Sequence, residues 1–405
     1  MSRRRVAVTG MGMICANGAD VASAWPALLA GRCGTGPVRA VDTTRIGSRT
    51  AGEVAGFDPL AHFPPKRVNV LDRSAQFAVV AAREAMADAG LAALPPGPRS
   101  DRCGAILGGP VGQVTMDAAY AQFYGARSDR VHPFTVPRLM PSASASQVSA
   151  DLGLRGMTYA VASACASAAH AIGQAFHAVA NGVLDLAVTG GSDAPLVPGV
   201  LRAWEALRVL SPDVCRPFSR NRPGLVLGEG AGMLVLEPWD DAIARGARIH
   251  GEIAGIGMSA DAADLTAPDA GGAARAMQAA LADAGEDPEA VGYVNAHGTG
   301  TRLNDLTESE ALRRVFGARL AHLPVSSTKS MIGHTLCAGG GIEAVTTLLA
   351  LRDGLLPPTA NFREPDPECP VDCIPDGARP THARLALSNS FAFGGLNAVL
   401  ALRKA

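Results

Sequence analysis

The sequence predicts an α/β protein made of two similar halves, in which mostly parallel sheets are covered by helices. Short apolar runs that indicate buried strands alternate with amphipathic helical stretches along the whole chain. Four landmarks recur in the same order in both parts of the chain, which indicates a duplicated domain. Aromatic residues make up only 4% of the 405 residues, so the core must be built from Ala, Val and Leu.

Each half begins with a glycine-rich strand and continues with a helix that ends in Ala-Asp-Ala-Gly. A short apolar strand follows that helix, and further on comes a helix of small residues. In chain order the landmarks lie at residues 6–13, 85–90, 103–107 and around Cys165, and again at 251–258, 280–285, 291–295 and after His334. The spacing between matching landmarks shrinks along the chain, so we expect the first half to carry insertions within 14–75 and 110–150. We therefore divide the chain into halves at 1–247 and 248–405.

Charge and hydropathy exclude several classes of protein. The net charge of −1 gives no sign of a nucleic-acid partner or a membrane-surface partner. No apolar run reaches the roughly 18 residues that a membrane span needs. The eight cysteines are scattered and lack the density of a secreted disulfide scaffold, and Cys369 and Cys373 have no second ligand pair at zinc spacing. We expect a cytoplasmic protein without a metal site.

Cys165 lies where an apolar strand passes through small residues into an Ala-rich helix. Unpaired N–H groups and partial positive charge at a helix N-terminus favour a thiolate, and such N–H groups can also bind an oxyanion. Free cysteines are often core residues, so this segment alone leaves a buried structural cysteine open.

Two further segments supply histidines and a lysine. His297 follows a predicted strand and is surrounded by Gly and Thr, at the strand end where open α/β sheets place their sites. Lys329 and His334 stand five residues apart before a Gly-rich helix, and Glu343 in that helix can neutralise the lysine. A solvated lysine and a capping histidine are the simpler alternative for that pair.

The last segment, residues 387–397, is a strand, a Phe-Gly-Gly turn and another strand. Glycine turns allow close approach of backbone to a ligand, and core packing is the alternative for Phe391 and Phe393. A cysteine, two histidines, a lysine and a glycine turn at strand ends together form the arrangement expected for acyl transfer.

These segments, in this order, resemble the elongating β-ketoacyl-acyl-carrier-protein synthases of type II fatty-acid and polyketide systems. The resemblance covers nearly the whole chain and implies the thiolase fold, two halves that form a five-layered αβαβα core, normally dimeric. It also implies decarboxylative condensation of a cysteine-bound acyl chain with malonyl-ACP (ACP, acyl carrier protein). The substrates would be carried on the phosphopantetheine of a separate acidic ACP, and no other cofactor would be needed.

The resemblance assigns roles residue by residue. Cys165 is the nucleophile, and the N–H groups of Cys165 and Phe393 form the oxyanion hole. His297 and His334 assist decarboxylation, while Lys329 holds the hydrogen-bond network with support from Glu343. The remaining positions contact substrate: Thr299 and Thr301 the pantetheine, and Phe391, Phe393, Pro110, Val200 and Trp204 the gate and acyl pocket.

Some positions depart from the family pattern. Ala392 and Leu396 replace the usual Gly and Thr beside the gate, and Cys337 stands where the family usually has Gly. A thiolase would need a second catalytic cysteine in the last loop, and an initiating synthase would have Asn in place of His334. A catalytically silent chain-length factor lacks the nucleophile, but a heterodimer in which this chain is the active half stays open beside a homodimer. The candidate ACP contacts are basic residues: Lys66, Arg67, Arg130 and Arg208.

Overall fold

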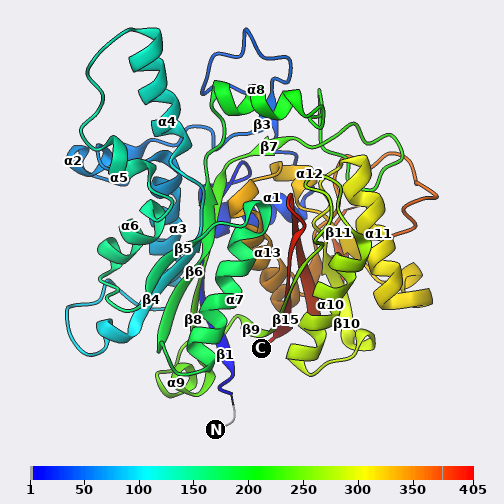
Figure 1. The fold of residues 1–405 in the computed structure, drawn as a ribbon. Helices are drawn as coiled ribbons and strands as arrows, with labels where there is room; N and C mark the ends of the chain where they lie inside the picture. Colours follow the sequence, from blue (N-terminus) through cyan, green and yellow to red (C-terminus); the bar gives the residue numbers. More distant parts are fainter. Residues whose placement is uncertain (1–2, 376) are drawn as a thin grey trace.

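A computed structural model describes residues 3–375 and 377–405, and it consists of two halves with the same topology (Figure 1). Within each half, five strands run in equivalent spatial order. In the first half the order is β5 (Thr158–Val161), β4 (Cys103–Gly108), β6 (Leu186–Asp193), β8 (Gly230–Pro238) and β1 (Val6–Ile14). In the second it is β11 (Val325–Ser326), β10 (Val291–Asn295), β14 (Leu385–Ala392), β15 (Leu396–Lys404) and β9 (Gly251–Ala260). The predicted duplication is therefore present in the topology.

The two halves join where β1 pairs antiparallel with β9, so that their strands form one ten-stranded sheet. The sheets are mixed, which differs from the mostly parallel sheets we expected. Strands β5, β4 and β6 are parallel, whereas β8 runs antiparallel to both of its neighbours. In the second half β14 and β15 form a hairpin, because only the short turn at residues 393–395 connects them.

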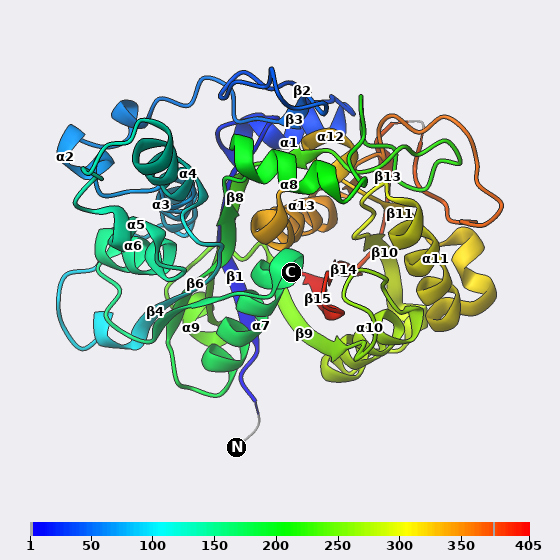
Figure 2. The ribbon, with the colours of Figure 1, turned by 45° about the horizontal axis from the view of Figure 1, so that its top comes forward.

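The helices complete five layers (Figure 2). The middle layer consists of α7 (Ser167–Ala180) and α13 (Gly339–Asp353), which lie between the two sheet halves. The outer layers are α3 (Arg73–Asp88) with α6 (Ala143–Leu152) on one side, and α10 (Ala270–Ala284) with α11 (Arg302–Phe316) on the other. This is the αβαβα arrangement that the resemblance implied.

The repeated sequence landmarks have a physical cause in the packing of strand on helix. A Cβ at Gly10 of β1 would lie 1.9 Å from the carbonyl oxygen of Ala85 in α3, and one at Gly257 of β9 would lie 1.9 Å from that of Ala276 in α10. Only glycine allows each strand to cross its helix so closely. The Ala-Asp-Ala-Gly ends are helix ends, since Gly90 and Gly285 have the left-handed φ angles of +69° and +66° typical of the residue after a helix.

The first half carries the insertions, as expected. One contains β2 (Gly36–Pro37), β3 (Thr50–Gly52) and α2 (Pro65–Val68), and a second forms an arm of α4 (Gln113–Tyr120) and α5 (Thr135–Leu139). The remaining elements are α1 (Val21–Leu29), α8 (Pro198–Ala206), β7 (Leu227–Gly228), α9 (Trp239–Ala244), α12 (Lys329–Ile332), β12 (Leu355–Leu356) and β13 (Arg379–Pro380). Within the described ranges, no helix is both long enough and apolar enough to cross a membrane.

Candidate active site

Cys165 lies in a single 3-10 turn, Ala164–Ala166, at the start of α7 and in the centre of the molecule. Ala164 before it has a φ of +48°, a left-handed conformation that is uncommon for a residue with a side chain and is typical of strained functional turns. Ser167 holds this turn, because its hydroxyl donates to the carbonyl of Ala164 and accepts from the N–H of Ser163. The second half repeats the geometry at Leu336, whose φ is +47°.

The histidines reach Cys165 from the other half of the chain. Nε2 of His334 lies 3.1 Å from Sγ of Cys165. The ring of His297, which follows β10, lies 5.3 Å from the ring of His334 at nearly a right angle, and Phe391 contacts the other side of His297. All of these side chains are buried. The contact between Cys165 and His334 thus joins residues 169 positions apart in sequence.

Lys329 and Glu343 form a buried ion pair, in which each side chain is only 2% exposed. Lys329 begins α12, and Glu343 lies in α13, so the pair links the two helices that flank His334. A buried lysine requires such a partner because its desolvation is costly. The predicted association of Glu343 with Lys329 is thus found in the structure.

Burial sets the protonation states of the site. Desolvation, aided by the positive charge of Lys329, lowers the pKa of His297 and of His334 well below 6.5, so both imidazoles are neutral at pH 7. Burial raises the pKa of the Cys165 thiol to about 12, although the nearby Lys329 opposes the shift. The helix N-terminus by itself predicted a favoured thiolate, but here burial outweighs it, and the resting sulfur is a thiol.

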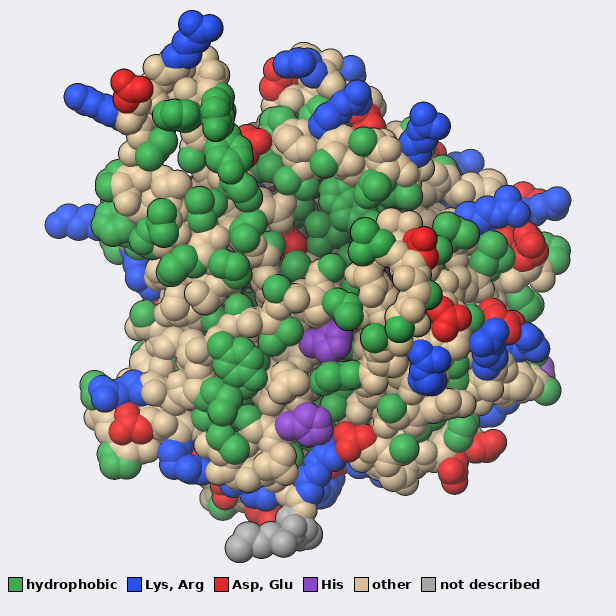
Figure 3. Space-filling view, viewed as in Figure 1, with side chains coloured by type: hydrophobic (Ala, Val, Ile, Leu, Met, Phe, Trp, Pro, Cys, Tyr) green, Lys and Arg blue, Asp and Glu red, His purple; other side chains and the backbone are tan. Residues whose placement is uncertain are grey.

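A pocket of about 430 Å³ opens onto Cys165, His297 and His334. Thr299 and Thr301 line it and share a hydrogen bond of 2.9 Å between their hydroxyls. Phe391, Phe393 and Trp204 also line it. Hydrophobic side chains gather beneath α8 at this opening in the space-filling view (Figure 3).

Of the other predicted contact residues, Arg208 lines this pocket and the rest do not. Pro110 follows β4 and Val200 lies in α8, and neither side chain lines the pocket, so their assignment to an acyl tunnel stays a prediction. Of the candidate ACP contacts, Arg208 lines the pocket mouth. The other three, Lys66, Arg67 and Arg130, lie in α2 and the α4–α5 arm region.

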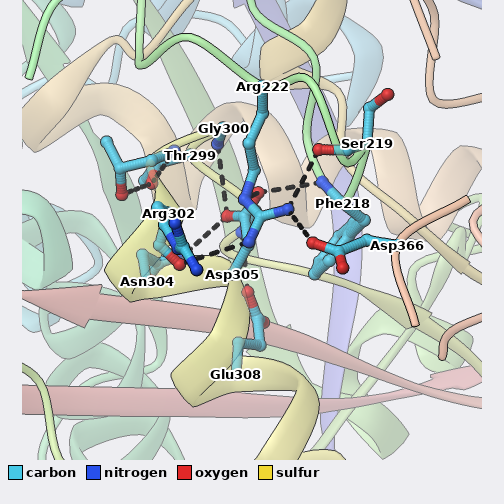
Figure 4. A network of polar contacts seen from close by, with 12 residues as sticks. Phe218, Ser219, Arg222, Thr299, Gly300, Arg302, Asn304, Asp305, Glu308 and Asp366 are labelled. Carbon is cyan, nitrogen blue, oxygen red and sulfur yellow. Dashed lines mark hydrogen bonds and ion pairs between the residues drawn. The ribbon is translucent and has the colours of Figure 1, made fainter. Parts of the chain in front are cut away.

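Two carboxylates that sequence reasoning missed, those of Asp305 and Glu308, hold the loop of His297, and Figure 4 shows both side chains with the bond between Asp305 and Gly300. Glu308 accepts hydrogen bonds from the N–H groups of His297 and Gly298, at 2.8 and 2.7 Å, and from the side chain of Asn389. Asp305 accepts from the N–H of Gly300. Both belong to α11, three residues apart and directly after the loop, and that spacing on one helix face was the available signal.

Asp305 is also the centre of a wider network. It accepts from the N–H of Phe218 and lies 3.6 Å from Arg222, whose guanidinium also bonds to Asp366 (Figure 4). Burial raises the pKa of Asp305 to about 6 and that of Glu308 to about 7. The loop that carries the histidine and both threonines is therefore fixed by buried groups.

Cys337, the equivalent of Cys165 in the second half, is also buried and has a different environment. Its N–H donates to the carboxylate of Asp193, and the hydroxyl oxygen of Ser167 lies 3.6 Å from its sulfur. Burial raises the pKa of the Cys337 thiol well above 9, as burial also raises that of Cys165, so the contacts of the two sulfurs distinguish them and their pKa values do not. Burial also raises the pKa of Asp193 to about 7, and the charge of Asp193 in turn raises the pKa of Cys165.

Comparison with known proteins covers the whole chain. Residues 3–242 match the family model of the β-ketoacyl synthase N-terminal domain, and residues 250–363 match that of the C-terminal domain. Nodulation protein E of Rhizobium sp. (strain N33) is 47% identical over 402 residues, 99% of each chain. The 3-oxoacyl-[acyl-carrier-protein] synthase 2 of Staphylococcus aureus (strain COL) is 42% identical over 409 residues, 99% of this chain and 98% of that one. The solved structure of the ishigamide ketosynthase/chain length factor superposes with a TM-score of 0.95 at 38% identity and covers all of both chains.

Proposed function

The chain belongs to the β-ketoacyl synthase family, and we propose that Cys165, His297, His334 and Lys329 carry out its condensation reaction. It is a condensing enzyme of the acyltransferase class that elongates an acyl chain by decarboxylative condensation. The observation that carries the residue assignment is the contact of 3.1 Å between Cys165 Sγ and His334 Nε2, with His297 beside them in one pocket.

In the first half-reaction the sulfur of Cys165 attacks the thioester of acyl-ACP. The carbonyl oxygen becomes an oxyanion, which the N–H groups of Cys165 and Phe393 stabilise by hydrogen bonds. The carbon–sulfur bond to the pantetheine then breaks, and the proton of the Cys165 thiol ends on the leaving thiol. His334 Nε2 is placed to pass that proton, since it already contacts the sulfur.

In the second half-reaction malonyl-ACP loses CO2 and leaves an enolate. Because His297 and His334 are neutral, each carries one N–H. Once Cys165 is acylated, its sulfur has no proton for Nε2 of His334 to accept, so His334 can adopt the tautomer with its proton on Nε2. Both imidazoles can then donate an N–H to the enolate oxygen, whose charge develops only as CO2 departs. The enolate carbon attacks the acyl group on Cys165, and the sulfur leaves as a thiolate that takes a proton from solvent. The loss of CO2 drives the condensation, so side chains and backbone N–H groups suffice and we propose no further cofactor.

The same site argues against the alternative activities. A silent chain-length factor would lack the nucleophile, whereas here Cys165, both histidines and Lys329 lie together. A thiolase would need a second cysteine in the 391–397 turn, and the turn contains none. The sulfur of Cys337, the rival nucleophile, lies beside the hydroxyl of Ser167, whereas the sulfur of Cys165 contacts an imidazole.

The test is covalent capture. On incubation with acyl-ACP, the intact mass of the wild type is expected to rise by one acyl group. Cys165→Ala should abolish the adduct, and Cys337→Ala, a matched change at the equivalent turn of the second half, should retain it. An adduct that survives Cys165→Ala, or no adduct on the wild type, would refute the assignment.

The protein that brings substrates to this pocket is an acyl carrier protein. The name of one relative, 3-oxoacyl-[acyl-carrier-protein] synthase 2, includes such a carrier. We propose that the phosphopantetheine arm passes Thr299 and Thr301, which line the pocket between its mouth and Cys165. Arg208 at the mouth is suited to an acidic carrier protein. Reversing its charge in Arg208→Glu should raise the KM for acyl-ACP and leave the KM for a pantetheine-linked acyl thioester unchanged.

A second subunit is expected on the face that includes β5. This strand lies at the edge of the sheet, where its backbone groups are open to pairing with another strand. The neighbouring α4–α5 arm exposes several apolar side chains, which appear together in Figure 3. They include Tyr120 at 59%, Tyr124 at 73% and Val136 at 70% exposure. Native mass spectrometry of the purified chain alone distinguishes a homodimer from a chain that needs a chain-length-factor partner.

We propose a cytoplasmic location and a division of the chain at residues 247 and 248. The candidate nucleophile Cys165 acts through its thiol, and reducing compartments such as the cytoplasm keep thiols reduced. The division falls between α9 and β9, where one repeated unit ends and the next begins.

A further inference from the structure

Ser167, the first residue of α7, contacts the turn that carries Cys165 and has no part in the mechanism given above. Its side chain is fully buried. The hydroxyl donates to the carbonyl of Ala164 at 2.6 Å and accepts from the N–H of Ser163 at 2.9 Å. The same oxygen lies 3.6 Å from the sulfur of Cys337. Since the hydroxyl has one proton and Ala164 receives it, the serine holds the turn by its carbonyl.

This contact fixes the direction of the N–H of Cys165. The carbonyl of Ala164 and the N–H of Cys165 belong to one planar peptide unit, in which they point in opposite directions. Because Ser167 holds the carbonyl, the N–H points away from Ser167. Within residues 3–375 and 377–405, no oxygen accepts a hydrogen bond from this N–H, so it is open to a substrate oxygen. The φ of +48° at Ala164 is unfavourable for a residue with a side chain and persists only where neighbouring groups hold it.

His170, which lies one helical turn further along α7, contacts the turn on both sides. Its Nδ1 lies 2.8 Å from the hydroxyl of Ser163 and 3.2 Å from the carbonyl of Ala166. A carbonyl can only accept, so both contacts are favourable when Nδ1 carries the proton of the ring. The N–H of Ala166 also donates to the carbonyl of Ser163, at 3.1 Å, and His170 therefore adds a second link across the same turn.

The equivalent turn in the second half is held in the opposite way. Leu336 has the same left-handed φ, at +47°, but Gly339 stands at the position of Ser167 and has no side chain. There the N–H of Cys337 donates to the carboxylate of Asp193, at 3.1 Å. The second turn is thus fixed from its N–H, which is already bonded to an anion, whereas the first is fixed from its carbonyl and keeps its N–H free.

We propose that Ser167 and His170 are positioning residues that hold the N–H of Cys165 in the direction that the oxyanion requires. This rests on the proposed function, in which that N–H stabilises the oxyanion formed when the sulfur attacks a thioester. Donors in such a site are effective because they are oriented before the charge develops. Ser167 acts through the carbonyl of Ala164, and His170 acts through the residues on either side of the turn.

Two reactions of the same sulfur separate this role from a general effect on structure. Attack of Cys165 on acyl-ACP forms an oxyanion, whereas alkylation by iodoacetamide displaces iodide and forms none. Ser167→Ala should slow acylation about tenfold or more, but less than the roughly 100- to 1,000-fold that removal of an oxyanion donor costs. The KM for acyl-ACP and the rate of alkylation should stay near their wild-type values, because neither depends on the direction of the N–H.

The histidine offers a conservative variant, and α6 offers a matched control. His170→Phe removes the link and should slow acylation about two- to tenfold, whereas His170→Asn places an amide N–H near the position of Nδ1 and should stay close to the wild type. Ser146 in α6 also donates its hydroxyl to the carbonyl three residues before it, that of Ala143. Ser146→Ala should therefore change neither reaction.

The carbonyl of the acyl group on Cys165 gives a direct readout. Isotope-edited infrared difference spectra of the enzyme acylated with a ¹³C-labelled thioester should show a stretch lowered by hydrogen bonding in the wild type. In Ser167→Ala that stretch should move toward its value in the free thioester, and in Ser146→Ala it should not move.

The outcomes distinguish the role from its alternatives. An equal loss of acylation and alkylation, or an acylation rate that neither Ser167→Ala nor His170→Phe lowers, would overturn the proposal. If Ser167→Ala does not fold, the contrast between His170→Phe and His170→Asn makes the same test. The absence of any acyl adduct on the wild type would instead refute the proposed function itself.

Discussion

The buried pair of Lys329 and Glu343 offers a way to separate stability from catalysis. Replacing Lys329 alone by Met leaves the carboxylate of Glu343, whose side chain is 2% exposed, without its partner. Breaking a buried pair in this way costs about 3–5 kcal/mol of unfolding free energy. The double variant Lys329→Met/Glu343→Leu removes both charges and keeps similar volumes, so its stability should return to within about 1–2 kcal/mol of the wild type.

In the double variant, Cys165 should nevertheless be a poorer nucleophile than in the wild type. Lys329 is the main group that lowers the pKa of Cys165 against the effect of burial, so its loss raises that pKa, and the loss of the smaller, opposite effect of Glu343 offsets only part of the rise. Because the thiolate is the reacting species, a higher pKa lowers the thiolate fraction and hence the rate of alkylation at fixed pH. The pKa of each histidine should rise at the same time, because Lys329 lowers both.

The assays are urea unfolding at pH 7 and the pH dependence of Cys165 alkylation by iodoacetamide, with Cys165→Ala as the blank. The exposed pair of Arg313 and Glu310 is the matched control, since Arg313→Met should cost less than about 1 kcal/mol and leave alkylation unchanged. The reasoning fails if the double variant is as unstable as Lys329→Met, or if it is stable and its Cys165 reacts at the wild-type rate.

Three more predictions concern neighbouring buried groups. Asp193→Asn removes a charge that raises the pKa of Cys165, so alkylation above pH 7, where Asp193 ionises, should become faster; an unchanged pH profile would contradict this. Glu308 has a folded pKa of about 7 against 4.5 when unfolded. The folded state therefore binds more protons between these values, and stability should fall by about 3 kcal/mol as pH rises through that window. In urea titrations at pH 4.5 and 7, Glu308→Gln should lose less unfolding free energy between the two pH values than the wild type does. An equal loss in both proteins would contradict this prediction. Finally, a Cβ at Gly340 would lie 2.8 Å from the N–H nitrogen of Ala169, so Gly340→Ala should push α13 from α7 and cost about 1–3 kcal/mol by thermal or urea unfolding.

Local patterns in the sequence determined the architecture. The glycines that let β1 and β9 cross their helices, and those that end α3 and α10, are required by backbone geometry and therefore recur in both halves. The strained turn before Cys165 and the glycine-rich loop after His297 are also local, so the candidate nucleophile and histidine were visible before their surroundings. Such features can be recognised because a turn or a helix cap is specified by neighbouring residues, and because the glycines at the close crossings recur in both halves.

Only the tertiary structure decided which distant groups share the interior. The contact of His334 with Cys165, the support of the His297 loop by Glu308, and the stacking of Trp204 on Phe393 all join segments far apart in sequence. Burial, which the sequence does not display, raised the pKa of Cys165 where the helix terminus alone predicted a thiolate. The physical reason is that desolvation and charge compensation depend on everything packed around a group, whereas periodicity and turn chemistry depend only on its neighbours in the chain.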